Sequence, residues 1–451
     1  MRRGTTATLF SLGLAASLPG CGGVHPEQDT DRSVEFRHHG VDSPPILQLP
    51  DWRYIPPGSG IRTSAGAGGL SDPTVNYSLA LRTAAIKLVG ELPTLDEIKQ
   101  MEAAASTSQA HQVYVSLVRK YINDRPRFAR QMVQYWRDTL RMGGSIMGFV
   151  SDTNNMRAVD LETGPRFAAQ LTVEGSDMRR LFTQDRNTCP TYDVATGNFT
   201  PAPCAARDGN EGLQEGEHVG ILTHPAFLAH YYSNYAFRRV RLIQELFACH
   251  KFPAEFTDKP ERGDGYLYVS PWPKFSITSQ ERPPVFTERR RIRGPGFTRV
   301  ADMRDYAWVR YGFDCASCHA TMNHQAPLFM NFDGIGILRT RSMVQTPVDD
   351  APFAQMADYV PAGEKMAWRY QKETPTIRAF GQAMAEDPEV IKCFIIRAWN
   401  RAMSRADVVN DLAIVPDAVV RELTEQFRTS LNYNLKEALL LIYTHPTFIR
   451  F

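Results

Sequence analysis

The sequence predicts a mainly α-helical fold, and three observations support this. After about residue 72, apolar side chains recur every three or four residues, which is the period of an amphipathic helix. Helix-start signals precede several of these stripes, such as the capping box that opens at Thr94. No convincing run of residues alternates between apolar and polar as a half-buried strand does. We expect a helical N-terminal region, a central segment with irregular loops and a small helical C-terminal domain.

Length and composition narrow the class of protein. A chain of 451 residues can bury sizeable cores and predicts two or three packed units. Apolar residues make up 43% and charged residues 22%, as in ordinary soluble globular proteins. Because 51 Lys and Arg nearly balance 49 Asp and Glu, nothing in the charge indicates nucleic acid as a partner.

The N-terminus has the features of an export signal over residues 1–20. Arg2 and Arg3 precede an apolar run from Ala7 to Leu18, which is too short to span a bilayer. Leu18-Pro19-Gly20-Cys21 then resembles a bacterial lipobox, although Pro19 is not the favoured residue there. We expect lipidation at Cys21, which would anchor the protein to a membrane by acyl chains. Ordinary signal cleavage nearby is the alternative.

Residues 21–71 form the next predicted segment. They are rich in Gly, Pro, Ser and charge and end in Ala65-Gly66-Ala67-Gly68-Gly69, a composition typical of a flexible tether. A tether behind a lipidated Cys21 predicts a membrane-anchored lipoprotein in the periplasm or at the cell surface.

We predict an N-terminal helical domain over residues 72–218. Its first helix carries a stripe between Leu81 and Leu88 and stops near Gly90, and the second begins at the Thr94 capping box. Two more helices follow, the later one starting at Asp124-Arg125-Pro126 and ending at Gly143-Gly144. Their apolar stripes are Val113, Leu117, Val118 and Tyr121, then Phe128, Met132, Trp136 and Leu140. Residues 186–218 are polar, and we expect them to form a loop region outside the helices that contains Cys189 and Cys204.

The second predicted domain, residues 219–370, opens on a helical stretch at Thr223-His224-Pro225. A similar phrase, Thr444-His445-Pro446, closes the chain. Two His-Pro pairs suggest either a ligand role for His224 and His445 or helix-start turns, and we favour the turns because Pro suits the first turn of a helix. Residues 251–295 contain many prolines and little periodicity, so we expect a long linker.

The central motif of this domain is Cys315-Ala316-Ser317-Cys318-His319, a C-x-x-C-H sequence. This spacing is the attachment signature of c-type haem, in which two thiols add to the haem vinyl groups. His319 would then be the proximal axial ligand of the iron. A second C-x-x-C for a zinc site is absent from the sequence, and no βαβ pattern supports a thioredoxin-like dithiol. We expect one covalent haem c, with a plain disulfide or thiol pair as the alternative.

Several residues near the motif in sequence are candidates to contact the haem or a redox partner. Arg289, Arg290, Arg291 and Arg293 form a basic cluster that would pair with haem propionates or an acidic redox partner, although a solvated loop is the favoured interpretation. Met343, Met356 and Met366 are candidates for a sixth ligand, but methionines more often pack in a core. His324 is too close in sequence to His319 to reach the opposite face easily. Asp333 is either a turn residue, which we favour, or a distal acid.

The C-terminal helical domain is predicted over residues 371–451. Three amphipathic helices are expected, and Asn434 caps a last short helix with Leu439 and Ile442. The three stripes are Ile377, Phe380 and Met384; Val390, Ile391, Phe394 and Trp399; and Val419, Val420, Leu423 and Phe427.

Seven cysteines remain to be assigned in an exported chain. One for lipid and two for haem leave Cys189, Cys204, Cys249 and Cys393, which allow three pairings. Cys189 and Cys204 flank one short loop and most simply pair with each other, so that Cys249 would join Cys393. Both bonds are plausible in an oxidising compartment, while two buried thiols at Cys249 and Cys393 are the alternative.

The chain after about residue 75 resembles the planctomycete-type cytochrome c proteins, exported proteins with a haem motif that are also common in myxobacteria. The most specific match runs from Cys315 to Arg339, a Cys-x-x-Cys-His-x-x-Met followed by Asn-Phe-Asp-x-Ile-Gly. The other phrases that are similar to the family are Leu88–Thr94, Arg127-Phe128 with Trp136, Gly220–Leu228, the Cys249 region, Cys393–Arg405 and Phe448. Where the family has Asp-Pro-x-Gly after the motif, this chain has Asn323-His324-Gln325-Ala326.

These observations predict a monohaem electron-transfer lipoprotein with an unidentified redox partner protein. A haem enzyme of the peroxidase or oxidase type, with an open sixth position and Asp333 as distal acid, is the second hypothesis. The third is a structural or binding lipoprotein in which Cys315 and Cys318 form only a disulfide. The resemblance implies the cofactor more than the reaction, because the family has no settled activity.

Overall fold

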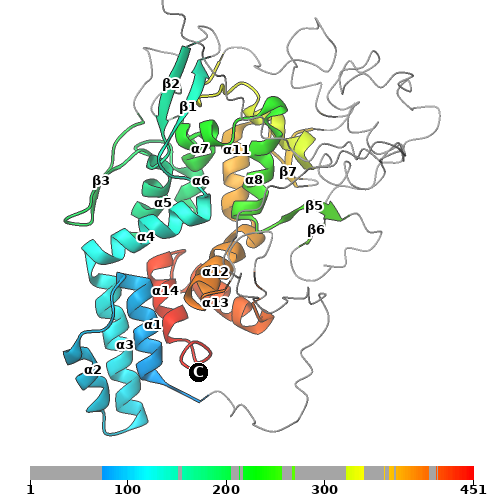
Figure 1. Cartoon of the computed structure of the whole chain (residues 1–451). Helices are drawn as coiled ribbons and strands as arrows, with labels where there is room; N and C mark the ends of the chain where they lie inside the picture. Colours follow the sequence, from blue (N-terminus) through cyan, green and yellow to red (C-terminus); the bar gives the residue numbers. More distant parts are fainter. Residues whose placement is uncertain are drawn as a thin grey trace, which may run out of the picture. The chain divides into compact units, whose positions relative to one another are not determined.

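The computed structural model describes residues 74–150, 155–204, 213, 217–255, 267–269, 321–339, 360, 365–369, 372–405, 413 and 415–451. Within them the fold is mainly α with only small two-stranded sheets, which confirms the predicted class (Figure 1). Several predictions concern residues outside the described ranges: Cys21, the tether, Arg289–Arg293, the motif Cys315–His319, Met343 and Met356.

The first part of the fold contains the four predicted helices, α1 (Tyr77–Val89), α2 (Leu95–Glu102), α3 (Thr107–Asn123) and α4 (Arg125–Leu140). Each begins with a side chain that accepts a hydrogen bond from a backbone N–H of the first turn, namely Asn76, Thr94, Ser106 and Asp124. The capping box between Thr94 and Glu97 is complete, and α1 ends at Gly90 in the left-handed conformation, both as predicted.

The prediction was wrong at the end of α4. The left-handed cap is Arg141, two residues before Gly143, and the chain then forms a hairpin of β1 (Ser145–Val150) and β2 (Asn155–Asp160). The two strands are antiparallel, with Ser145 opposite Asp160. The sequence of β1, Ser-Ile-Met-Gly-Phe-Val, places apolar residues side by side, so it lacks the alternation by which strands are recognised.

Helix α5 (Thr163–Val173) was also not predicted. It packs against α4, and nearly all of its side chains are buried rather than one stripe of them. A helix that is buried all round has no amphipathic period to detect. The Trp136 indole N–H donates to Thr172 Oγ1 at 2.9 Å and joins α4 to α5 in the core. The short α6 (Arg180–Thr183) follows, then the hairpin of β3 (Thr191–Asp193) and β4 (Asn198–Thr200).

The second part begins with the 3-10 turn η1 (Gly220–Thr223), α7 (Pro225–His230), the 3-10 turn η2 (Asn234–Ala236) and α8 (Phe237–Phe247). The predicted linker over 251–295 is not wholly irregular, because β5 (Lys251–Glu255) pairs in parallel with β6 (Leu267–Val269). Downstream, the described elements are the 3-10 turn η3 (Ala326–Phe329) and the pair β7 (Ala367–Arg369) and β8 (Lys372–Glu373).

The C-terminal part contains α11 (Ile377–Glu386), α12 (Pro388–Ala402), α13 (Asp417–Thr429) and α14 (Leu435–Thr444), at the four places where helices were predicted. The His-Pro prediction holds at one of its two positions. His224 begins α7 with Pro225 in the first turn, whereas His445 follows the end of α14 and begins no helix. The same three residues thus start one helix and end another.

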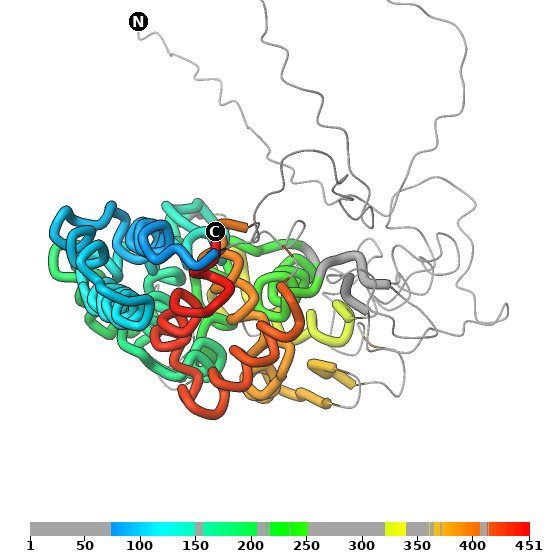
Figure 2. The backbone as a smooth tube through the Cα atoms, turned by 90° about the horizontal axis from the view of Figure 1, so that it is seen from below, coloured from blue at the N-terminus to red at the C-terminus, as the bar shows by residue number. Residues whose placement is uncertain are grey.

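One cluster of buried hydrophobic side chains runs from Ala80 to Ile449 and includes residues of all three predicted domains. The two ends of the described chain meet, because Val75 forms a β-bridge with Arg450 and the Tyr114 hydroxyl donates to Tyr443 O at 2.6 Å. Figure 2 shows the blue α1 beside the red C-terminal helix. The predicted domain boundaries stay predictions. No described helix combines the length and the apolar character needed to cross a membrane.

Candidate functional site

The candidate site is the segment Thr321–Arg339, whose first residue lies two positions after His319. Residues 321–325 are helical and η3 follows directly. Four polar side chains in this short run are fully buried, namely Thr321, Asn323, His324 and Gln325. The apolar side chains of Met322, Phe329, Phe332, Ile335 and Ile337 join the core cluster. The segment Thr321–Arg339 is therefore built into the interior.

Arg239 of α8 holds this segment in place. Its side chain is 1% exposed and donates all five guanidinium N–H groups to backbone carbonyls. Nη1 donates to Phe329 O at 2.8 Å and Phe332 O at 2.9 Å, and Nη2 donates to Asp333 O at 2.8 Å. Three carbonyls of the candidate site thus share one cation.

The same guanidinium also caps the C-terminal end of α7. Nε and Nη2 of Arg239 donate to Leu228 O at 3.1 and 2.8 Å, and this carbonyl belongs to the last turn of that helix. Burial lowers the pKa of Arg239 to about 10, so the group remains charged at neutral pH. A cation at a helix C-terminus is electrostatically favourable, which helps to offset the burial of its charge.

Asp333 organises the turn at the end of the segment. Its Oδ1 accepts from the backbone N–H groups of Ile335 and Ile337, each at 2.9 Å. Its Oδ2 accepts from Arg339 Nε at 2.9 Å and Nη2 at 2.7 Å. The carboxylate is fully buried and accepts four hydrogen bonds, so the turn interpretation fits and a distal acid at Asp333 does not.

Two glycines let other elements approach this turn closely. A Cβ at Gly148 of β1 would lie 2.4 Å from Gly334 O, so the hairpin backbone touches the turn directly. Gly336 has φ +79° and lies against Pro225 at the start of α7, where a Cβ would meet backbone atoms at 2.9 Å. The turn is therefore enclosed by β1, α7 and α8.

A chain of hydrogen bonds links the segment to the C-terminal part. Gln244 Nε2 of α8 donates to Gln325 Oε1 at 2.9 Å, and Gln325 Nε2 donates to Trp368 O at 2.8 Å. The Trp368 indole N–H donates to Asp387 Oδ2 at 2.6 Å. Burial alone would raise the pKa of Asp387, but hydrogen bonds from Arg369 and Trp368 and the Arg369 charge hold that pKa below its usual value.

The C-terminal end of α8 is held by a covalent bond. Cys249 forms a disulfide with Cys393 of α12, which is the pairing that the cysteine count favours. Arg397, one turn further along α12, donates from Nε to Leu246 O and from Nη2 to Glu245 O, both at 3.0 Å. A cation therefore also satisfies the last carbonyls of α8.

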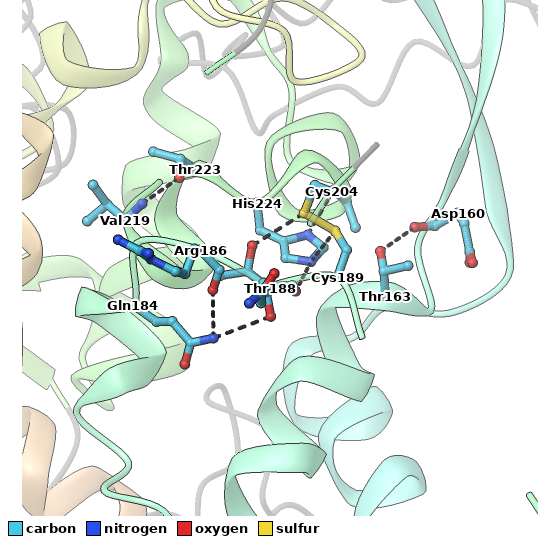
Figure 3. Close-up of a disulfide and its surroundings, with 12 residues drawn as sticks. Asp160, Thr163, Gln184, Arg186, Thr188, Cys189, Cys204, Val219, Thr223 and His224 are labelled. Atoms are coloured by element: carbon cyan, nitrogen blue, oxygen red, sulfur yellow. Dashed lines mark hydrogen bonds between the residues drawn. A yellow bond between two sulfur atoms is a disulfide. The ribbon is translucent and has the colours of Figure 1, made fainter. Parts of the chain in front are cut away.

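The other disulfide, Cys189–Cys204, lies beside His224 (Figure 3). The ligand atoms of these three residues lie within 4.8 Å of one another, a spacing that would suit a metal ion. The sulfurs are bonded to each other, however, and therefore do not offer thiolate ligands. His224 Nδ1 accepts from Ala226 N at 3.2 Å and Nε2 lies 2.9 Å from Thr188 O, so a neutral Nε2–H imidazole caps α7 and holds the loop. The turn interpretation of His224 thus fits better than a ligand.

The structure brings some predicted site residues together and leaves others outside its scope. Cys189 with Cys204 and Cys249 with Cys393 are paired, Met366 and His324 are buried, and Asp333 is engaged in its turn. Cys21, Cys315, Cys318 and His319 lie outside the described residues.

Arg239 was missed at the level of sequence, although a signal exists. It lies three and four residues before Leu242 and Ile243, which are core residues of the same helix, so a charged residue occupies the apolar stripe. A buried arginine in such a stripe needs carbonyl or carboxylate partners from elsewhere in the chain.

Comparison of the chain with protein families, curated proteins and solved structures finds no match. The assignment of function therefore depends on the residues of the chain and their arrangement.

Proposed function

We propose that the protein is an exported, monohaem c-type cytochrome-like lipoprotein that transfers single electrons. Cys315 and Cys318 would hold the haem covalently, and His319 would be its proximal ligand. The observation that carries the proposal is the spacing Cys-x-x-Cys-His in a chain that also begins with an export signal. A bound haem would supply an iron centre that gains and loses one electron.

The cysteine pairing supports this proposal. Four of the seven cysteines are joined in Cys189–Cys204 and Cys249–Cys393, so Cys315 and Cys318 have no partner among them. Apart from the two motif cysteines, the sequence then contains only Cys21, which lies in the lipobox-like phrase. The two motif thiols are thus left for haem or for each other.

The described part of the segment after the motif is compatible with a haem protein. It contributes buried apolar side chains such as Met322 and Phe329, and an apolar environment is one of the factors that set a haem potential. Asp333, the acid that a peroxidase-like mechanism would use, already accepts four hydrogen bonds. Electron transfer is therefore a better proposal than peroxide or oxygen chemistry.

The proposed location follows from the N-terminus. Lipidation at Cys21 would hold the protein at a membrane facing the periplasm or the cell surface, and the tether of residues 21–71 would give it reach. The proposed partner is another redox protein in the same compartment. Resemblance to the planctomycete-type cytochrome c proteins agrees with this assignment.

The test is the absorption spectrum and intact mass of protein exported by a host with cytochrome c maturation. We expect a haem-adduct mass and sharp reduced bands of six-coordinate iron, both lost in Cys315→Ser. Cys21→Ser is the matched control, because it should release the protein from the membrane and leave the spectrum unchanged. A high-spin spectrum with cyanide binding would instead favour the enzyme, and a colourless protein of apo mass would leave a disulfide-bonded helical lipoprotein.

A further inference from the structure

A polar pocket lies away from the candidate site, where α5 and α6 meet the loop that the Cys189–Cys204 disulfide closes. Its volume is about 560 Å³, which is within the range of about 300–1,000 Å³ usual for small-molecule sites. Leu171 and Pro201 contribute apolar wall, and the charged lining residues are Glu174, Arg180, Asp185 and Arg186. Two carboxylates and two guanidinium groups therefore line a pocket of zero net charge.

The four charges are not equivalent. Arg186 Nε contacts the neighbouring Asp185 Oδ1 at 3.2 Å, so these two residues satisfy each other. Arg180 forms no ion pair with a carboxylate of the described residues. Glu174 accepts from Gln170 Nε2 at 3.3 Å on each carboxylate oxygen, and its cationic neighbour Arg125 Nη2 is 3.9 Å away, beyond hydrogen-bond distance. Among the described residues, the same pocket thus contains a guanidinium with no carboxylate partner and a carboxylate that a neutral amide holds without a closely paired cation.

Gln184 shows an additional unmet hydrogen-bonding group in the pocket wall. Its Nε2 donates to Arg186 O at 2.8 Å and to Asn187 O at 3.3 Å, which fixes the orientation of the amide (Figure 3). Its buried Oε1 then accepts no hydrogen bond. A buried acceptor without a donor costs free energy, which a ligand N–H or an ordered water would recover.

We propose that this pocket binds a small zwitterion of the amino-acid or short-peptide class. The ligand carboxylate would pair with Arg180, whose planar guanidinium suits bidentate contact, and the ligand ammonium would pair with Glu174. The disulfide keeps the wall in place, because Asn187 precedes Cys189 by two residues and Pro201 precedes Cys204 by three. This binding activity is independent of the proposed haem function.

The test is isothermal titration calorimetry of the full exported chain with the protein amino acids and with dipeptides of small, apolar, acidic and basic residues. At least one of these should bind saturably, and its N-acetylated and C-amidated forms should each bind at least about tenfold more weakly, since each lacks one charge-assisted contact. Inorganic phosphate tests simple anion binding.

Two variants separate the two contacts. Arg180→Ala should weaken binding of the zwitterion at least about tenfold, and N-acetylation of the ligand should weaken the remaining binding further because the ammonium contact with Glu174 is intact. Glu174→Gln should also weaken binding at least about tenfold, and C-amidation of the ligand should weaken the remaining binding further because the carboxylate contact with Arg180 is intact. Arg119→Ala, which removes a half-exposed arginine paired with Glu437 at 3.5 Å on the α3–α14 surface, is the matched control and should bind as the unchanged chain does. Thermal midpoints should match in all three variants because Arg180, Glu174 and Arg119 are exposed.

Three results would overturn the proposal: no saturable binding of any zwitterion at millimolar concentration, phosphate binding as tightly as the best zwitterion, or unchanged affinity in both pocket variants. Because binding is measured without reference to haem, these results remain separate from any failure of the spectral test.

Discussion

The two ends of α8 are fastened in different ways. Near its N-terminus, Arg239 holds three carbonyls of the segment Thr321–Arg339 by hydrogen bonds alone. Just beyond its C-terminus, Cys249 is covalently joined to Cys393 of α12, and Arg397 caps the helix end. In both places a buried guanidinium satisfies the last carbonyls of a helix, but only one of them is supported by a disulfide.

The difference separates two sources of stability. The disulfide lowers the entropy of the unfolded chain, and it connects residues 144 apart in the sequence. The Arg239 contacts act only in the folded chain, where removing the donors leaves buried carbonyls unsatisfied. We therefore expect the Arg239 end to depend on the side chain itself and the other end to depend on redox conditions.

The largest effect should come from breaking the Arg239 end. Arg239→Met should lower the free energy of unfolding by about 5 kcal/mol, because four buried carbonyls lose charge-assisted hydrogen bonds. Urea unfolding followed by far-ultraviolet circular dichroism measures this. Arg239→Lys keeps the charge but has fewer N–H donors, so its free energy of unfolding should lie between those of the unchanged protein and Arg239→Met.

Arg238→Met on the same helix is the matched control. Its guanidinium lies 5.6 Å from the centre of the Tyr231 ring, so the loss should be about 0.5–1 kcal/mol. Equal losses in both variants would contradict the special role of Arg239.

The second effect concerns the covalent end. Replacing both Cys249 and Cys393 with Ser should cost about 4 kcal/mol, and the loss should vanish when the two proteins are compared in a strong reductant. The pair Cys189→Ser and Cys204→Ser, which opens a separation of only 15 residues, should cost less, about 3 kcal/mol. A larger loss from the short loop would refute the chain-entropy account of these bonds.

The third effect tests the link between the two ends, in which Asp387 holds Trp368 and Trp368 O accepts from Gln325. Because the pKa of Asp387 is lower in the folded chain than in the unfolded one, its contribution is present above about pH 4 and is lost as pH falls through the folded pKa. Asp387→Asn should cost about 2 kcal/mol at pH 7 and less in acid.

The test is to measure the free energy of unfolding of the unchanged protein and of Asp387→Asn between about pH 3 and pH 7, a range that includes the usual carboxyl pKa. A difference that stays constant across the series would mean that the charge of Asp387 contributes nothing.

The smallest effect is expected far from both ends of α8. Thr94→Ala removes the hydrogen bond from Glu97 N to Thr94 Oγ1 and should cost about 1 kcal/mol. Combined with Arg239→Met, its effect should add, because the two sites share no contacts. Thermal or urea unfolding of the single and double variants would reveal any coupling between them.

Much of the helical pattern could be predicted because it is written in local signals. Apolar stripes and N-caps located α1 to α4 and α11 to α14. What was missed lacks such signals. Helix α5 is buried on all sides, and β1 has adjacent apolar residues around Gly148, so neither shows the expected period.

The candidate site was harder to predict because its contacts join distant residues. Arg239 meets Phe329 across 90 positions and Asp333 across 94, and the pattern around either residue names no partner. His224 and His445 show the same limit, since identical Thr-His-Pro phrases begin one helix and end another according to what packs around them. The local sequence predicts a turn at each Thr-His-Pro phrase but not whether a helix begins or ends there.

The pairing of the two ends of the described chain has a mechanical consequence. Thr74 and Phe451 exchange backbone hydrogen bonds of 3.2 and 3.1 Å, and Asn76 N donates to Ile449 O at 2.8 Å. Tension applied through the residues before Thr74 would load these antiparallel backbone hydrogen bonds before any force reached α8 or the segment that it holds. A pull on the chain ahead of Thr74 would thus open the pairing of the two ends first.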